Sequence, residues 1–164
     1  MSASATVNAT SSLGLVVVAA GSSRRFGSDK LSVRLGGRTI LPRAVGCLRA
    51  VFPQAPLVVV VRGEELEGRA EELRDLGVTA FVPGGEHRQD SVRAGVEALH
   101  LSGEALVLIH DGARPFVPAD DIRRVVAAAE EAGAAVLAAP VADTVKEVDP
   151  QGRVLGTLPR ERLV

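Results

Sequence analysis

Residues Leu15–Lys30 read LVVVAAGSSRRFGSDK, and the prediction of the fold starts from this stretch. The apolar, valine-rich run at its beginning is short and uninterrupted, which is typical of a strand buried in a parallel sheet. The run ends at Gly21, where the backbone can turn sharply. Serine, arginine and lysine residues follow, and a loop of this composition at the carboxyl end of a strand suits a polyphosphate. The alternative is a surface turn with solvated basic side chains.

Two named nucleotide-binding motifs do not account for this loop. A Walker A loop needs Gly-x-x-x-x-Gly-Lys-Ser/Thr, but Gly21 and Gly27 are too far apart and Ser28 stands where lysine should be. The dinucleotide fingerprint Gly-x-Gly-x-x-Gly needs a second glycine, and Ser23 occupies its place. The fingerprint also needs an acid about 20 residues on, and the region around Leu41 holds none.

Strands and helices alternate along the rest of the chain. The apolar pattern predicts helices at 41–52, 64–76, 88–100 and 119–132, and further strands at 57–61, 78–82, 105–109 and 134–139. A short hairpin is expected where Leu31–Leu35 meets Gly36 and Gly37. This order predicts an α/β fold, a mostly parallel sheet with helices on both faces.

The pattern divides the chain into four parts. Residues 1–12 carry no charge and predict a disordered tail, and 13–140 predict a nucleotide-binding α/β domain. Residues 141–158 alternate around a Pro-Gln-Gly turn and are too polar for core strands, so they predict a projecting β-arm. Residues 159–164 resemble the first turns of a helix.

Composition excludes several classes of function. With 19 basic and 20 acidic residues the net charge is −1, so nothing global attracts nucleic acid or an anionic membrane, and any anion site must be local. The uncharged residues 1–12 lack the basic residues of a secretory or transit signal, and no apolar run is long enough to span a membrane. The single cysteine, Cys47, cannot form an internal disulfide, which fits a cytoplasmic protein.

Two further strand ends carry reactive side chains. Glycines at 84 and 85 permit close approach to a flat base, and Asp90 and Ser91 can hydrogen-bond a nucleotide or cap the helix that follows. Asp111 follows a predicted buried strand, where it would hold a divalent cation or pair with Arg114 in a tight turn. We find no histidine or cysteine spacing typical of zinc and no nucleophile elbow or catalytic triad.

The chain resembles the 2-C-methyl-D-erythritol 4-phosphate cytidylyltransferase family of the non-mevalonate isoprenoid pathway. Five motifs carry the resemblance, in order over residues 15 to 163: AAGSSRRFG with Lys30, PGGEHRQDSV, VLIHDGARPFV, AAPVADTVK and TLPRERL. The resemblance implies a Rossmann-like nucleotidyltransferase fold and a homodimer formed through the 141–158 arm. It implies transfer of a cytidylyl group from CTP to 2-C-methyl-D-erythritol 4-phosphate with Mg²⁺, releasing pyrophosphate. Two alternatives stay open: cytidylyl transfer to ribitol 5-phosphate, and a truncated chain that binds nucleotide without turnover.

The resemblance also implies the roles of individual residues. Those around the cytosine and ribose are Ala19, Ala20, Gly21, Gly85, Glu86 and Ser91, with Asp90 beside them. Those of the triphosphate loop are Ser22, Ser23, Arg24, Arg25 and Lys30. Asp111 matches the acid near the metal, and the expected catalytic groups are Arg25, Lys30 and Asp111. Contacts to the polyol phosphate are expected from Arg114, Thr144 and Arg160, the last two from the partner's arm.

Two departures from the family pattern stand out. Asp29 precedes the lysine where proline is common in the family. The family pattern also continues beyond Val164 with a late lysine and acidic positions that complete the phosphate and metal site. The chain is therefore expected to be a truncated member.

Overall fold

The computed structural model describes residues 12–21, 27 and 29–164. The predicted tail at 1–12 lies outside the described residues except for its last position. The chain forms two compact units, one ending at Ala134 and the other running over Ala135–Val164.

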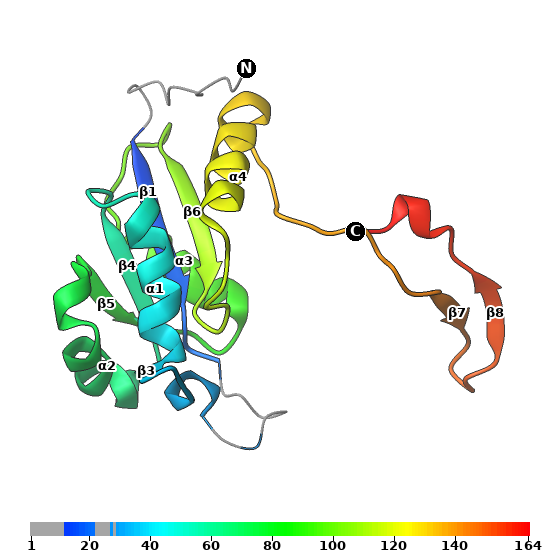
Figure 1. Ribbon diagram of the computed structural model, residues 1–164, viewed down its shortest axis with the longest axis horizontal. Coiled ribbons are helices and arrows are strands. Elements are labelled where there is room, and N and C mark those ends of the chain that lie inside the picture. Colours follow the sequence, from blue (N-terminus) through cyan, green and yellow to red (C-terminus); the bar gives the residue numbers. More distant parts are fainter. Residues whose placement is uncertain (1–11, 22–26, 28) are drawn as a thin grey trace. The chain divides into compact units, whose positions relative to one another are not determined.

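A four-stranded parallel sheet forms the centre of the first unit (Figure 1). Its strands are β1 (Leu13–Val18), β4 (Leu57–Val61), β5 (Ala80–Pro83) and β6 (Leu106–Asp111), in the spatial order β5-β4-β1-β6. The chain steps outward from β1 to β4 and β5, then returns to the other side of β1 for β6. Ligands of open α/β sheets bind at this kind of reversal, beyond the carboxyl ends of the strands.

Helices cover both faces of the sheet, as the sequence predicts. They are α1 (Ile40–Val51), α2 (Leu66–Glu72), α3 (Arg88–Glu97) and α4 (Ala119–Ala132). Apolar residues of α1 and α4 pack on one face, and α3 packs on the other. The right-handed crossover rule explains why α1 and α3 lie on opposite faces. The connection through α1 runs from β1 to β4, and the connection through α3 runs across the sheet in the opposite direction, from β5 to β6.

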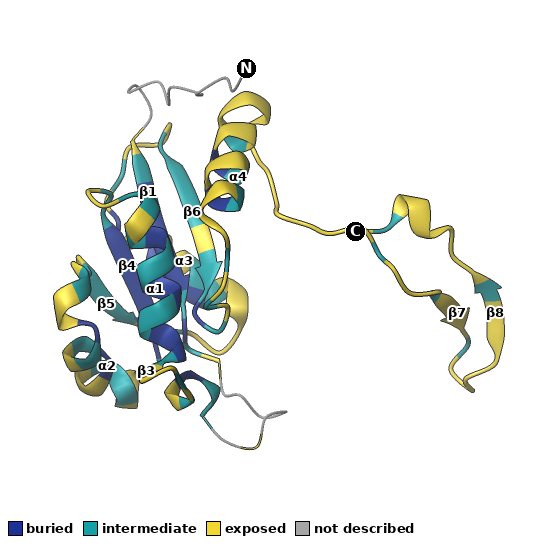
Figure 2. Cartoon of the chain, in the orientation of Figure 1, coloured by how far each residue is buried: buried dark blue, intermediate teal, exposed yellow. Residues whose placement is uncertain are grey.

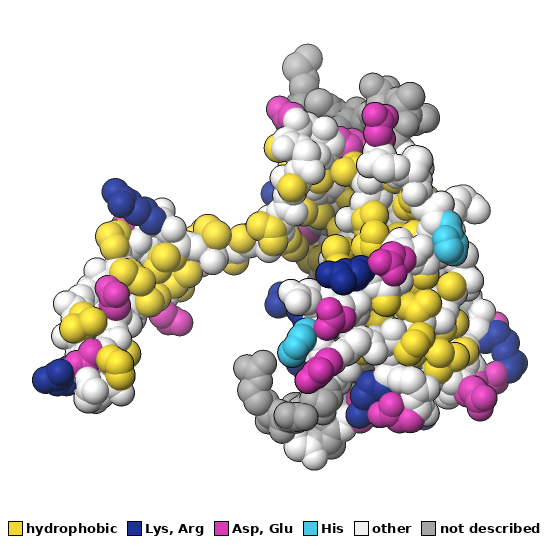
Figure 3. Space-filling model, turned by 180° about the vertical axis from the view of Figure 1, so that it is seen from behind, with side chains coloured by type: hydrophobic (Ala, Val, Ile, Leu, Met, Phe, Trp, Pro, Cys, Tyr) yellow, Lys and Arg dark blue, Asp and Glu magenta, His cyan; other side chains and the backbone are white. Residues whose placement is uncertain are grey.

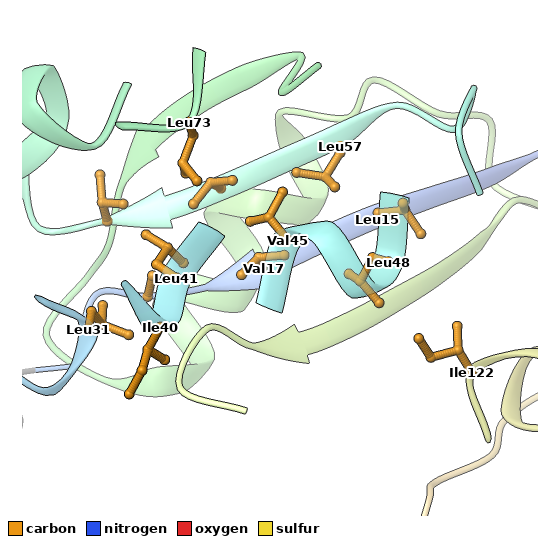
Figure 4. Close-up of a cluster of buried hydrophobic side chains, with 13 residues drawn as sticks. Leu15, Val17, Leu31, Ile40, Leu41, Val45, Leu48, Leu57, Leu73 and Ile122 are labelled. Atoms are coloured by element: carbon orange, nitrogen blue, oxygen red, sulfur yellow. The ribbon is translucent and has the colours of Figure 1, made fainter. Parts of the chain in front are cut away.

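The core lies between the sheet and these helices. The larger cluster joins β1 and β4 to α1, and Figure 4 shows Val45 and Leu48 of α1 beside Val17 and Leu15 of β1. β4 is buried along its whole length (Figure 2). On the opposite face α3 approaches so closely that a Cβ on Gly95 would lie 2.5 Å from Val16 Cγ1.

Several predicted elements have different ends in the structure. The helix expected at 64–76 is a 3-10 turn at Gly63–Glu65, then α2, then a second 3-10 turn at Arg74–Leu76 that Gly77 ends with a φ of 61°. The expected hairpin is present as β2 (Arg34–Leu35) and β3 (Arg38–Thr39), preceded by a 3-10 turn at Lys30–Ser32. Here the local pattern located the elements but not their limits.

The strand predicted at 134–139 is wrong. No strand forms there, and Val136 is 83% exposed. An apolar run becomes a strand only when a neighbouring strand accepts its backbone hydrogen bonds, and the described part of the sheet pairs no strand with this run.

The second unit contains the predicted hairpin. Strands β7 (Lys146–Val148) and β8 (Val154–Thr157) pair in antiparallel fashion, and the Asp149 carboxylate accepts hydrogen bonds from backbone N–H groups of the turn. The helix expected at 159–164 is a single 3-10 turn, Arg160–Arg162. Among the described residues of both units, no helix has the length and apolarity that a membrane crossing needs.

Candidate active site at the carboxyl edge of the sheet

A cavity of about 640 Å³ opens at the carboxyl edge of the sheet, where β1 and β6 end and the loop after β5 begins. It brings together residues from all three predicted strand-end motifs. The lining residues are Val18, Ala19, Ala20, Gly21, Lys30, Leu31, Gly85, Glu86, His87, Arg88, Ser91, Asp111, Ala113 and Arg114.

Close backbone packing shapes one wall of the cavity. Gly84 N donates to Val61 O at 2.8 Å, and a Cβ on Gly84 would lie only 2.3 Å from the Cβ of Ala20. Across β1, Gly112 N donates to Val18 O at 2.9 Å, which holds the loop after β6 against the end of β1. The glycine at position 84 is therefore required because the loop after β5 touches the end of β1 directly.

Ser91 stabilises the loop that leads into α3 through two hydrogen bonds to its backbone. Its hydroxyl accepts a hydrogen bond from Gly85 N at 3.1 Å and donates to His87 O at 3.4 Å, and the residue is 3% exposed. The carboxylate of Asp90 accepts from His87 N at 3.1 Å and so caps the helix. Of the two expectations for Asp90, the cap is observed, and its side chain does not line the cavity.

Asp111 lies between two guanidinium groups. Arg88 Nη1 is 2.8 Å from Asp111 Oδ1, and Arg114 Nε is 2.9 Å from Oδ2. The expected ion pair with Arg114 is thus present, and the carboxylate still lines the cavity. Among the lining residues, the basic side chains of Lys30, Arg88 and Arg114 outnumber the acidic ones, which favours an anionic ligand.

His110 and Asp111 are the last residues of β6, paired with Val17 and Val18 of β1, whereas the sequence placed them in the following loop. Pairing with β1 depends on backbone groups alone and so extends past the apolar residues. The His110 ring lies 3.0 Å from Arg114 O through Nε2, and burial lowers the pKa of the ring. Through this contact His110 stabilises the backbone of the loop that contains Arg114.

Most of the residues predicted for the site are in the cavity wall. Those found there are Ala19, Ala20, Gly21, Lys30, Gly85, Glu86, Ser91, Asp111 and Arg114. Ser22, Ser23, Arg24 and Arg25 lie outside the described residues. Thr144 and Arg160 belong to the second unit, where Arg160 Nη1 donates to Ala142 O at 3.0 Å, and their roles stay predictions.

Sequence reasoning missed Arg88. Its guanidinium reaches Asp111 from α3, although the two residues come from different motifs. A signal was present, because Arg88 precedes Ser91 by three residues on a predicted helix, and residues at that spacing share a helix face. A search for basic residues on the face of Ser91 would have found it.

The described residues fit a magnesium ion only in part. They contain no group of three or more potential ligands among histidine, cysteine and acidic side chains. Mg²⁺ in nucleotide enzymes is commonly held by one or two carboxylates, with phosphate oxygens and waters completing its shell. Asp111, a carboxylate in the cavity wall, fits the role of one such ligand.

Comparisons with known proteins point in one direction. The family model described as IspD, 2-C-methyl-D-erythritol 4-phosphate cytidylyltransferase, matches residues 13–164. A relative of that name from Dehalococcoides mccartyi is 43% identical over 160 residues, which cover 93% of this chain and 68% of the relative.

Solved structures agree with the sequence relatives. The 4-diphosphocytidyl-2C-methyl-D-erythritol synthase of Anaerococcus prevotii is similar with a TM-score of 0.78 at 25% identity, covering 93% of this chain and 66% of that one. The 2-C-methyl-D-erythritol 4-phosphate cytidylyltransferase of Thermus thermophilus has a TM-score of 0.63 at 34% identity, covering 89% and 63%. The chain spans about two thirds of the length of these proteins. The predicted nucleotidyltransferase fold is confirmed.

Proposed function

Because the chain belongs to the 2-C-methyl-D-erythritol 4-phosphate cytidylyltransferase family, we propose that it transfers the cytidylyl group of CTP to 2-C-methyl-D-erythritol 4-phosphate and releases pyrophosphate. One observation carries the proposal: a single cavity at the carboxyl edge of the sheet is lined by all three family motifs of the α/β unit. Its excess of basic side chains suits the triphosphate of the nucleotide.

The cytidine would lie against backbone. Ala19, Ala20 and Gly21 form one side of its pocket and Gly85 the other, with Ser91 holding Gly85 in place. Backbone N–H and C=O groups can read the amino and carbonyl edge of cytosine. A site built on such hydrogen bonds rejects a base that leaves them unpaired. CTP is therefore the expected nucleotide, with UTP much poorer and GTP hardly used.

The reaction needs positioning and charge stabilisation rather than a covalent enzyme intermediate. A phosphate oxygen of the polyol phosphate attacks the α-phosphorus of CTP, and the bond to pyrophosphate breaks as the new P–O bond forms. Lys30 and Arg25 are proposed to stabilise the charge that grows on the phosphate oxygens. Asp111 would hold Mg²⁺, which when bound neutralises phosphate charge.

The polyol phosphate would be held by Arg114 and, from the partner's arm, by Thr144 and Arg160. A homodimer through 141–158 is supported by the apolar side chains that this unit leaves exposed, and Figure 3 shows hydrophobic groups gathered on it. Val148, Val154 and Leu155 are each more than half exposed. Exposed apolar strands of this kind mark interfaces. A cytoplasmic location is part of the proposal, supported by the single free cysteine, Cys47.

The experiment is a pyrophosphate-release assay with CTP and GTP against 2-C-methyl-D-erythritol 4-phosphate and ribitol 5-phosphate. Turnover with CTP and the methylerythritol phosphate is expected. Lys30→Ala should lower kcat by on the order of 10²–10³, the usual effect of removing one preorganised charge-stabilising group. Comparable kcat/KM for CTP and GTP would refute the base pocket. CTP binding with no pyrophosphate release would support a chain that binds nucleotide without turnover.

A further inference from the structure

Arg69 is a buried cation outside the cavity. Its side chain on α2 is 8% exposed, and three carboxylates surround the guanidinium. Nη2 lies 2.5 Å from Asp29, Nη1 lies 2.8 Å from Glu72, and Nε lies 3.7 Å from Glu65. A buried arginine is rare unless it is paired and hydrogen-bonded, and these three carboxylates supply that pairing.

Only one of these carboxylates comes from a distant part of the chain. Glu65 and Glu72 are near Arg69 in the sequence: Glu65, four residues earlier, ends the 3-10 turn before α2, and Glu72, three residues later, is the last residue of α2. Asp29 precedes Arg69 by 40 residues and belongs to the segment that leads from the phosphate loop to α1. The tertiary effect of Arg69 is therefore to tie that segment to α2.

Arg69 and its carboxylate partners hold both ends of the segment 29–39. At its beginning Asp29 is paired with Arg69. At its end Thr39 donates its hydroxyl hydrogen to the Glu72 carboxylate, whose other oxygen is paired with Arg69. Thr39 is also the residue before α1. The segment that carries Lys30 is thus fastened to α2 at both ends.

Asp29 in turn organises the one-turn helix Lys30–Ser32. Its Oδ1 accepts a hydrogen bond from Leu31 N at 3.1 Å, and Oδ2 accepts from the Ser32 hydroxyl. Leu31 is 4% exposed and packs in the core cluster. Lys30 is thus flanked by a carboxylate held by Arg69 and by a side chain buried in the core, which fixes its backbone at the cavity wall.

We propose that Arg69 is a positioning residue for Lys30, acting through Asp29 to hold the lysine-bearing turn at the cavity. The inference rests on the proposed function, because it takes Lys30 to contact the triphosphate. Arg69 itself is not among the described residues that line the cavity.

The first test is a double-mutant cycle on the dissociation constant of CTP, measured by calorimetry with Mg²⁺ present. Arg69→Gln should weaken CTP roughly tenfold, the effect of loosening one charge-assisted contact to phosphate. On a Lys30→Ala background the same change should alter the affinity by less than about twofold, because the residue it positions is gone. Equal losses on both backgrounds, or no loss on the first, would overturn the proposal.

Two further variants keep the test decisive. Asp29→Asn removes the charge that Arg69 holds but leaves Glu72 on the guanidinium, so it should reproduce the loss even where Arg69→Gln does not fold. Arg74→Gln is the matched control. Arg74 lies just after α2, is exposed and pairs with Glu71, so its replacement should leave CTP affinity unchanged. A similar loss in Arg74→Gln would assign the effect to general charge and refute positioning.

Hydrogen exchange gives a readout that does not depend on CTP. In Arg69→Gln the amides of Leu31 and Val33, bonded to Asp29 Oδ1 and Lys30 O, should exchange faster while amides of α3 keep their rates. A uniform increase in amide exchange rates over the whole chain would overturn the proposal, because it would indicate that Arg69 only stabilises the fold in general. If Lys30→Ala bound CTP as tightly as the unaltered chain, the proposed function would fail at Lys30, and hydrogen exchange would still decide the role of Arg69.

Discussion

Replacing Gly84 by alanine should damage the fold and the nucleotide pocket together. The Cβ of the new residue would lie 2.3 Å from Ala20 Cβ and 2.7 Å from Ser91 Oγ. Non-bonded carbon atoms prefer about 3.5–4.0 Å, so Ala20 or the loop must move by about 1 Å. The φ of Gly84 is not in the left-handed region, so alanine adds no backbone strain and the cost is steric.

Overpacking of this kind typically costs about 1–3 kcal/mol of unfolding free energy. Because both displaced side chains line the cavity, CTP binding should also weaken by about tenfold or more, as expected when binding groups shift by about 1 Å. Urea unfolding and calorimetry with CTP would measure the two effects. Gly63→Ala is the matched control, since among the described atoms its Cβ would meet only Pro83 Cβ, at 4.0 Å. If Gly84→Ala matched this control in both measurements, the inferred contact between the loop and β1 would be wrong.

Three other changes test the core, a helix and an ion pair. Leu48→Ala should lower the unfolding free energy by about 2–5 kcal/mol, because the side chain is 1% exposed within the larger core cluster. Gly46→Ala inside α1 should raise it by about 0.5–1 kcal/mol, since a Cβ there meets no described atom within 4 Å and glycine weakens helices; a loss of stability would contradict this. Although burial alone would raise the pKa of Asp29, hydrogen bonds from Ser32 and Leu31 and the Arg69 guanidinium hold that pKa below its ordinary value of 3.8. The contribution of Asp29 is thus present above pH ~4 and is lost as pH falls through its folded pKa, so Asp29→Asn should flatten the acid side of the stability profile in urea unfolding.

Elements with strong local boundaries were predicted accurately. β4 occupies Leu57–Val61 as expected, because a short, valine-rich apolar run after Pro56 is typical of a buried strand. α4 spans Ala119–Ala132, between Pro118 before its first turn and Gly133, which takes a φ of 83° after its last. In both elements the residues that start and stop the structure are neighbours in the sequence.

Elements that depend on a distant partner were predicted less well. The run at 134–139 has the composition of a strand but no paired neighbour among the described strands. β6 extends to His110 and Asp111 because β1 supplies hydrogen-bond partners there. In both cases the outcome depended on a backbone partner many residues away, which no local pattern encodes.

The sequence by itself determined the order of strands and helices, the α/β class and the three strand-end motifs, because apolar periodicity and glycine or proline boundaries act over a few residues. Only the tertiary structure decided which side chains meet: Arg88 with Asp111, Gly84 with Ala20, and Arg69 with Asp29. Those contacts arise because the parallel strands bring their carboxyl ends to one edge, whereas the sequence separates the same residues by tens of positions. The motifs could thus be predicted from local sequence, but the ion pairs between them depend on the assembled sheet.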